Sequence, residues 1–110
     1  MSPRAAFVYS PELTTHVLRE DHPLRPVRLR YTYELLEAYG AFNGHTSRLV
    51  PPREARREEV LTFHTREYVE ATERFSRGEA LHEAPRYNFS QWGDNPVFPG
   101  IFQASMLSTG

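Results

Sequence analysis

The chain has 110 residues, of which 39% are hydrophobic and 25% are charged, and its formal net charge is −1. This composition allows one modest globular core and excludes a chain that is disordered throughout. All 13 basic residues are arginines, and they alternate with glutamates, as in Arg53 to Glu59. No basic stripe forms that could follow nucleic-acid phosphates, so we expect no nucleic-acid partner.

Two absences in the sequence narrow the chemistry further. Cysteine does not occur, which removes disulfides, thiolate zinc sites and cysteine nucleophiles from this stretch. No long apolar run follows the N-terminus, so the sequence predicts neither a secretory signal nor a membrane span. We therefore expect a cytoplasmic protein without a membrane partner.

The first half of the chain predicts a βαβ unit. Ala5 to Tyr9 is a short run of β-favouring apolar residues, which is typical of a strand buried on both faces. A helix is expected from about Pro26 to Tyr39, with Gly40 as its left-handed cap. Arg48 to Val50 is the second expected strand. A strand, a helix and a strand in this order indicate a parallel sheet within an α/β fold.

The polar stretch from Glu12 to Arg25 joins the first strand to this helix. We expect a loop with one helical turn at Pro11 to Leu13, because the stretch is rich in proline and histidine. It is long for a mere connection, and long ordered loops in compact domains are often functional.

The second half of the chain predicts helices. A short helix is expected over Arg53 to Phe63, with Val60, Leu61 and Phe63 turned inward, and another over Thr65 to Ser76. Glu79 to Pro96 is expected to be irregular. Phe98 to Thr109 has an apolar side and a side of small residues, as in a helix packed closely against a sheet.

The expected strands and helices are too few to make a complete α/β domain. Two doubly buried strands need a wider sheet and helices on both of its faces. We therefore expect residues 1–110 to be the N-terminal portion of a larger single domain, cut before the domain is complete.

The segment Gly93-Asp94-Asn95-Pro96-Val97-Phe98 places a lone carboxylate on a stiff loop. Proline fixes its own φ and pushes the preceding residue out of the helical region, so the shape of this loop is largely prescribed. Two interpretations of Asp94 are open from the segment alone. The simpler is a cap for the following helix, and the other is a carboxylate held for contact with a ligand.

The five histidines do not form a metal site by spacing. None of them makes an i, i+4 pair on a helix. His64 is interpreted as a structural residue between two helices, and His16, His45 and His82 as surface or loop residues. Neither a glycine-rich phosphate loop nor a Gly-x-Ser-x-Gly elbow occurs, so composition and spacing name no reaction.

Four segments, in order and at compatible spacing over nearly the whole chain, resemble the start of the histone deacetylase superfamily. The likeness is greatest to class I-like members, including bacterial acetoin-utilisation proteins. The segments are Val8 to Glu12; His22-Pro23-Leu24-Arg25-Pro26-Val27-Arg28; Phe63-His64-Thr65-x-x-Tyr68; and Arg86 to Phe89 followed by Gly93 to Phe98, Gly100 to Phe102 and Leu107 to Gly110. Each segment alone is a weak pattern, but together they are specific.

The resemblance implies an arginase/deacetylase-type three-layer α/β fold with a central parallel sheet. It also implies hydrolysis of acetyl-lysine, or of a related acetylated amine, by a zinc-bound water. In the family two aspartates and a histidine hold the metal, and a histidine pair supplies the acid and base. This chain has no His-His pair, no Asp-x-His motif and only two aspartates, Asp21 and Asp94. We expect zinc and activity in the full-length protein, and neither in the 110-residue chain alone.

The residues that the resemblance carries over lie around such a site. Asp94 matches the rim aspartate that accepts hydrogen bonds from the substrate backbone and so orients it. His22 and Pro23 match the wall of the tunnel entrance. Arg28 matches the arginine of the internal cavity, although a helix-surface arginine is the simpler interpretation without the family.

Two departures and one alternative remain open at this point. Asn95 stands where many class I members have cysteine, and Trp92 adds bulk at the rim, so both bear on substrate preference. The alternative is a non-catalytic fragment or interaction module that keeps the loop with Asp94. In either case, exposed sheet edges and apolar helix faces favour self-association.

Overall fold

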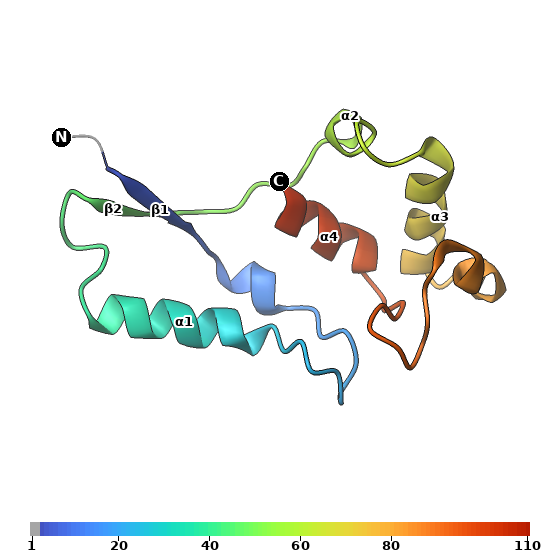
Figure 1. The fold of residues 1–110 in the computed structure, drawn as a ribbon, viewed down its shortest axis with the longest axis horizontal. Coiled ribbons are helices and arrows are strands. Elements are labelled where there is room, and N and C mark those ends of the chain that lie inside the picture. Colours follow the sequence, from blue (N-terminus) through green and yellow to red (C-terminus); the bar gives the residue numbers. More distant parts are fainter. Residues whose placement is uncertain (1–2) are drawn as a thin grey trace.

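The chain is extended rather than closed around one centre. The computed structural model describes residues 3–110. Met1 and Ser2, which belong to the N-terminal stretch where no secretory signal is expected, lie outside the described residues. The radius of gyration is 16.6 Å, against about 13 Å for a compact chain of this length. The accessible surface is 7935 Å², against roughly 6,300 Å² for a compact protein of this mass. Figure 1 shows the first half of the chain at one end of the long axis and much of the second half at the other.

The predicted βαβ unit is confirmed. Strand β1 (Ala5–Val8) pairs in parallel with β2 (Ser47–Val50), with Ala5 opposite Ser47 and Val8 opposite Val50. Helix α1 (Val27–Ala38) forms the crossover between them, alongside the sheet in Figure 1. Gly40 has a φ of +71° and ends α1 as expected, because glycine adopts this left-handed conformation without a Cβ clash. The expected turn before α1 is also present, as the 3₁₀ helix η1 (Pro11–Thr14).

The prediction that the first strand is buried on both faces is wrong for this chain. Ala5, Ala6 and Val8 are exposed, and Val8 retains 55% of its surface. The sheet has only two strands between residues 3 and 110, so both are edge strands. One face is covered by aromatic stacking, in which Tyr33 of α1 lies 4.6 Å from Tyr9 between ring centroids. Both strands therefore present the exposed edges expected from the sequence.

The helix predicted over Arg53 to Phe63 is much shorter than expected. Helix α2 spans only Arg57–Val60, and Phe63 is 86% exposed instead of turned inward. The chain before α2 is extended at Arg56, with φ −82° and ψ 152°, and the Ala55 N–H donates to the Met106 carbonyl at 2.8 Å. This hydrogen bond also joins the segment before α2 to the helix that contains Met106, α4 (Ile101–Thr109).

Helix α3 (Arg66–Ser76) confirms the prediction for this segment. Thr65 is its N-cap, and the threonine side chain accepts a hydrogen bond from the Tyr68 N–H at 3.2 Å, which satisfies one of the unpaired donors of the first turn. The following stretch, expected to be irregular, contains the 3₁₀ helix η2 (Leu81–Tyr87). Ala80 and Asn88 flank η2 at positive φ values of 52° and 66°.

Helix α4 (Ile101–Thr109) begins three residues later than predicted and does not pack on the sheet. Gly100 precedes it with a φ of +84°, and a side chain there would meet the His16 ring. Helix α4 instead contacts α3 and η1. Its small residues allow the close approach that the sequence indicated, but to a different partner. None of the helices in residues 3–110 has both the length and the apolar composition of a membrane span.

The core lies between α3, η2 and α4. Its fully or nearly buried members are Ala71, Phe75, Ala84, Phe89 and Ile101. Phe75 is 1% exposed and meets Phe89 edge to face at 5.7 Å between ring centroids. This core holds the chain on both sides of the loop at residues 90–96.

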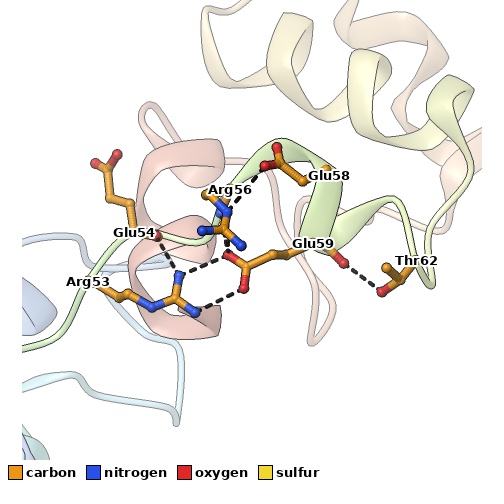
Figure 2. Close-up of polar contacts among 6 residues, drawn as sticks. All are labelled: Arg53, Glu54, Arg56, Glu58, Glu59 and Thr62. Carbon is orange, nitrogen blue, oxygen red and sulfur yellow. Dashed lines mark hydrogen bonds and ion pairs between the residues drawn. The ribbon is translucent and has the colours of Figure 1, made fainter.

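Arg53 and Glu59 fix the entry into α2 (Figure 2). The guanidinium of Arg53 donates to both carboxylate oxygens of Glu59, at 2.8 and 2.9 Å, and the Arg56 N–H donates to the same carboxylate at 2.8 Å. These contacts, with the Arg53 hydrogen bond first among them, lower the pKa of Glu59 to about 2. The carboxylate is therefore charged over the whole physiological range.

The ion pair of Arg53 and Glu59 should make the stability of the fold depend on pH. Because the pKa of Glu59 is lower in the folded chain, its stabilising contribution is complete above about pH 4.5, the ordinary pKa of a glutamate. The contribution is lost as the pH falls through about 2. We expect the unfolding midpoint to fall over this window, and Glu59→Gln to flatten that part of the curve. Thermal unfolding between pH 2 and 6 measures the midpoint. Equal slopes of midpoint against pH for the wild type and Glu59→Gln would contradict this prediction.

Candidate functional site

Two loops that are far apart in sequence meet at His22 and Asp94. The imidazole of His22 is 5% exposed. Its Nδ1 accepts a hydrogen bond from the Leu24 N–H at 3.0 Å, and its Nε2 lies 3.0 Å from the carbonyl oxygen of Asp94. Because Nδ1 accepts, the ring hydrogen of the neutral imidazole is on Nε2, which donates to the carbonyl. The structure thus brings together two of the residues singled out in the sequence.

Arg19 makes a second connection between the same loops. Its Nη1 donates to the carbonyl oxygens of Gln91 and Gly93, at 3.1 and 2.8 Å, and its Nε donates to the Asp21 carboxylate at 2.5 Å. The hydrogen bond from Arg19 lowers the pKa of Asp21. The Arg19 side chain is 15% exposed, and its guanidinium carbon lies 6.0 Å from the centre of the Trp92 ring. Sequence reasoning missed Arg19.

Asp94 projects from a tight loop and does not cap a helix. The Ser90 N–H donates to the Asn95 carbonyl at 2.9 Å, which closes the loop, and Pro96 is fully buried behind it. The N-cap of α4 is Gly100, without a side-chain hydrogen bond, so the capping interpretation is wrong. Asp94 is exposed, and within residues 3–110 its carboxylate forms neither a hydrogen bond nor an ion pair. Two carboxylate oxygens are therefore available to N–H donors of a ligand.

A groove of about 520 Å³ runs from this loop along α1 and α4. Its walls are mainly apolar and include Leu13, Leu29, Pro96 and Phe98, with Arg28 also on the lining. Arg28 is exposed to solvent at this groove, and Pro23 is exposed next to the buried His22. The four residues carried over from the resemblance thus lie on or next to the groove and the loop at residues 90–96, here called the rim loop. They are His22, Pro23, Arg28 and Asp94.

The remaining histidines do not assemble a metal site. In the part of the chain that the structure describes, no group of three or more His, Cys, Asp or Glu side chains could hold a metal ion. His64 is exposed between α2 and α3, where it stacks on Tyr68 at 5.0 Å between ring centroids. His45 and His82 are exposed, as predicted, and His16 is partly buried beside Phe98.

The chain is similar in sequence to known proteins over nearly its whole length. The pattern of the histone deacetylase domain matches residues 22–110. The chain is 33% identical to the acetoin utilization protein AcuC of Bacillus subtilis over 107 residues, 30% identical to histone deacetylase HDAC1 of Drosophila melanogaster over 112 and 27% identical to human histone deacetylase 1 over 110. These alignments cover 96 to 97% of this chain. They cover 27%, 20% and 22% of the relatives, respectively.

Proposed function

We propose that this chain, which belongs to the histone deacetylase family, is the N-terminal portion of a zinc-dependent deacetylase domain. The full-length protein would hydrolyse acetyl-lysine or a related acetylated amine. The observation that carries this proposal is the exposed carboxylate of Asp94, on a loop whose carbonyl is held by the buried His22. A carboxylate fixed in this way can accept two N–H hydrogen bonds from a substrate backbone, and such charge-assisted bonds are strong.

The other residues would form the surroundings of the acyl chain. His22 and Pro23 would line the entrance, since they lie on the loop next to Asp94. Arg28 would place a fixed positive charge on the groove between α1 and α4, where it can pair with a carboxylate such as acetate. In this role Arg28 would help the product to leave.

The fold of the full-length domain would be the three-layer arrangement with a central parallel sheet. Two features of this chain support that proposal. Its surface and radius of gyration exceed those of a compact protein of this size. Apolar side chains are also exposed on both strands and on α1, at Val8, Leu49 and Leu35. Further strands next to β1 and β2 would cover these groups, because parallel sheets are buried on both faces.

The donor set of this chain does not fit the zinc that the family implies. Within residues 3–110, the histidines and acidic residues do not converge on a common point. We therefore assign substrate orientation, and no zinc ligand, to this chain, and we propose that the ligands are supplied by residues outside 1–110. Reading the gene past Gly110 tests this. A His-His pair and an Asp-x-His segment are expected within about 80 residues, the remaining reach of a typical domain, and the enzyme proposal fails if neither occurs.

The purified 110-residue chain should neither hydrolyse an acetyl-lysine peptide nor bind zinc tightly at one equivalent. The physical reason is that a tight site needs three or four converging protein ligands, and residues 3–110 form no such group. Release of acetate and equilibrium dialysis with zinc measure the two properties. Zinc-dependent turnover by this chain would overturn the assignment of its residues to orientation alone.

The second candidate function is a non-catalytic fragment or interaction module. The same lack of converging metal ligands in residues 3–110 favours it, and the gene sequence past Gly110 separates the two functions. The exposed strand edges and the apolar side chains of α1 agree with self-association, which stays a prediction.

A further inference from the structure

We infer that Arg19 is a positioning residue that sets the direction of the Asp94 carboxylate. The role in substrate binding rests on the proposed function, but the positioning itself follows from the contacts of this chain. Arg19 is separated from the rim loop by more than seventy residues of sequence, since the bond to the Gly93 carbonyl spans 74 positions. The contact is therefore a tertiary one, made by a side chain that is 15% exposed.

The two peptide planes that flank Asp94 are both held from the same segment. The Gly93 carbonyl belongs to the plane before the Asp94 Cα and accepts from Arg19 at 2.8 Å. The Asp94 carbonyl belongs to the plane after it and accepts from His22 at 3.0 Å. Because peptide units are planar, the backbone at one residue has only two soft dihedral angles. Holding both planes fixes these angles at Asp94, and with them the direction of its Cα–Cβ bond.

The guanidinium group suits this task better than an ammonium group would. Its Nη1 donates to the carbonyls of Gln91 and Gly93, on either side of Trp92, while its Nε donates to the Asp21 carboxylate. Trp92, between these two residues, is 78% exposed. A planar group with five donors can make these bonds at once, whereas the point charge of a lysine cannot reproduce the geometry.

This arrangement predicts a preference between two classes of substrate. An acetylated peptide presents backbone N–H groups next to the acetyl-lysine, and these are the donors that Asp94 would accept. A simple N-acetylated alkylamine has no such donors. Arg19 should therefore increase turnover of peptides relative to small acetylated amines, and it should do so only through Asp94.

The experiment uses Arg19→Gln and Arg19→Lys in the full-length protein that contains this chain. Arg30→Gln is the matched control, because Arg30 lies on α1 and pairs there with Glu34 at the surface. The first readout is hydrogen exchange at the Ser90 and Gly93 amides, which form the hydrogen bonds inside the rim loop. The second is KM for an acetyl-lysine peptide and for an N-acetylated alkylamine, in wild type and in an Asp94→Ala background.

Both Arg19 variants should speed exchange at these amides by about tenfold, because each loses the part-buried hydrogen bond from the guanidinium to the Gly93 carbonyl. Arg19→Gln should raise KM for the peptide by about tenfold as well. KM for the alkylamine should stay unchanged, and Asp94→Ala should remove the effect of the Arg19 variants on the peptide. Arg30→Gln should change none of these values.

Unchanged hydrogen exchange in both Arg19 variants would overturn the positioning role, whether or not the protein is active. Faster exchange with an equal rise in KM for both substrates would overturn the route through Asp94. A wild-type protein that turns over neither substrate would refute the proposed function, and hydrogen exchange would still decide the positioning. Arg19→Lys keeps the charge, so faster exchange in this variant assigns the effect to the geometry of the guanidinium.

Discussion

Replacing Asp94 by alanine in the full-length protein is expected to lower kcat/KM for an acetylated peptide by roughly 10- to 100-fold, because one or two charge-assisted hydrogen bonds to the substrate are lost. The zinc content should remain that of the wild type. Asp94 is exposed on a loop between residues 90 and 96, and no other acidic residue or histidine side chain joins it in a metal-binding group within residues 3–110. Steady-state kinetics and metal analysis of the purified protein measure the two quantities.

Two further variants separate orientation by the carboxylate from a general effect of charge. Asp94→Asn keeps the shape and one acceptor oxygen, so its loss should be smaller than that of the alanine variant. Glu34→Gln removes an exposed carboxylate on α1 that pairs with Arg30 at 3.6 Å, and it should leave kcat/KM unchanged. Loss of zinc in Asp94→Ala would count against the proposed role, because the residue would then act on the metal site.

The helices that the sequence predicted well are those with local signals at their ends. Thr65 caps α3 with its side chain, and glycines with positive φ end α1 and α3 at Gly40 and Gly78. The helix η2 has such a signal only at its C-terminal end, where Asn88 adopts a positive φ, as asparagine does more readily than most residues. At its start Ala80 also has a positive φ, which local preference disfavours for alanine, and Pro85 lies inside the helix. Burial of Ala84 and Phe89 in the core stabilises this conformation, and such tertiary packing cannot be read from the segment alone.

The sequence predicted only those parts of the site that depend on the identity of a side chain. His22 and Asp94 stood out because they belong to segments with a recognisable pattern. The link between them is made through the backbone carbonyl of Asp94, and Arg19 likewise bonds to the carbonyls of Gln91 and Gly93. Every residue has a carbonyl oxygen, so an acceptor of this kind leaves no trace in the sequence. Arg19 therefore looked like any surface arginine of a polar loop.

The largest loss of stability is expected from Phe75→Ala. Phe75 is 1% exposed and meets the rings of Tyr87 and Phe89 edge to face, at 5.8 and 5.7 Å between centroids. Removing a buried phenylalanine leaves a cavity and should cost about 3–5 kcal/mol, a large part of the 5–15 kcal/mol that typically stabilises a domain. The midpoint and slope of urea unfolding, followed in the 110-residue chain, give the change in the free energy of unfolding.

Phe63→Ala provides the matched control in the 110-residue chain, where it removes the same side chain from a position that is 86% exposed. A surface substitution of this kind should change the free energy of unfolding by no more than about 0.5 kcal/mol. Phe89 joins the core to the start of the rim loop, so Phe75→Ala should also speed hydrogen exchange at Ser90 and Gly93, whereas Phe63→Ala should not. Equal effects of the two variants would mean that the contacts of α3 with η2 and α4 do not hold the loop that carries Asp94.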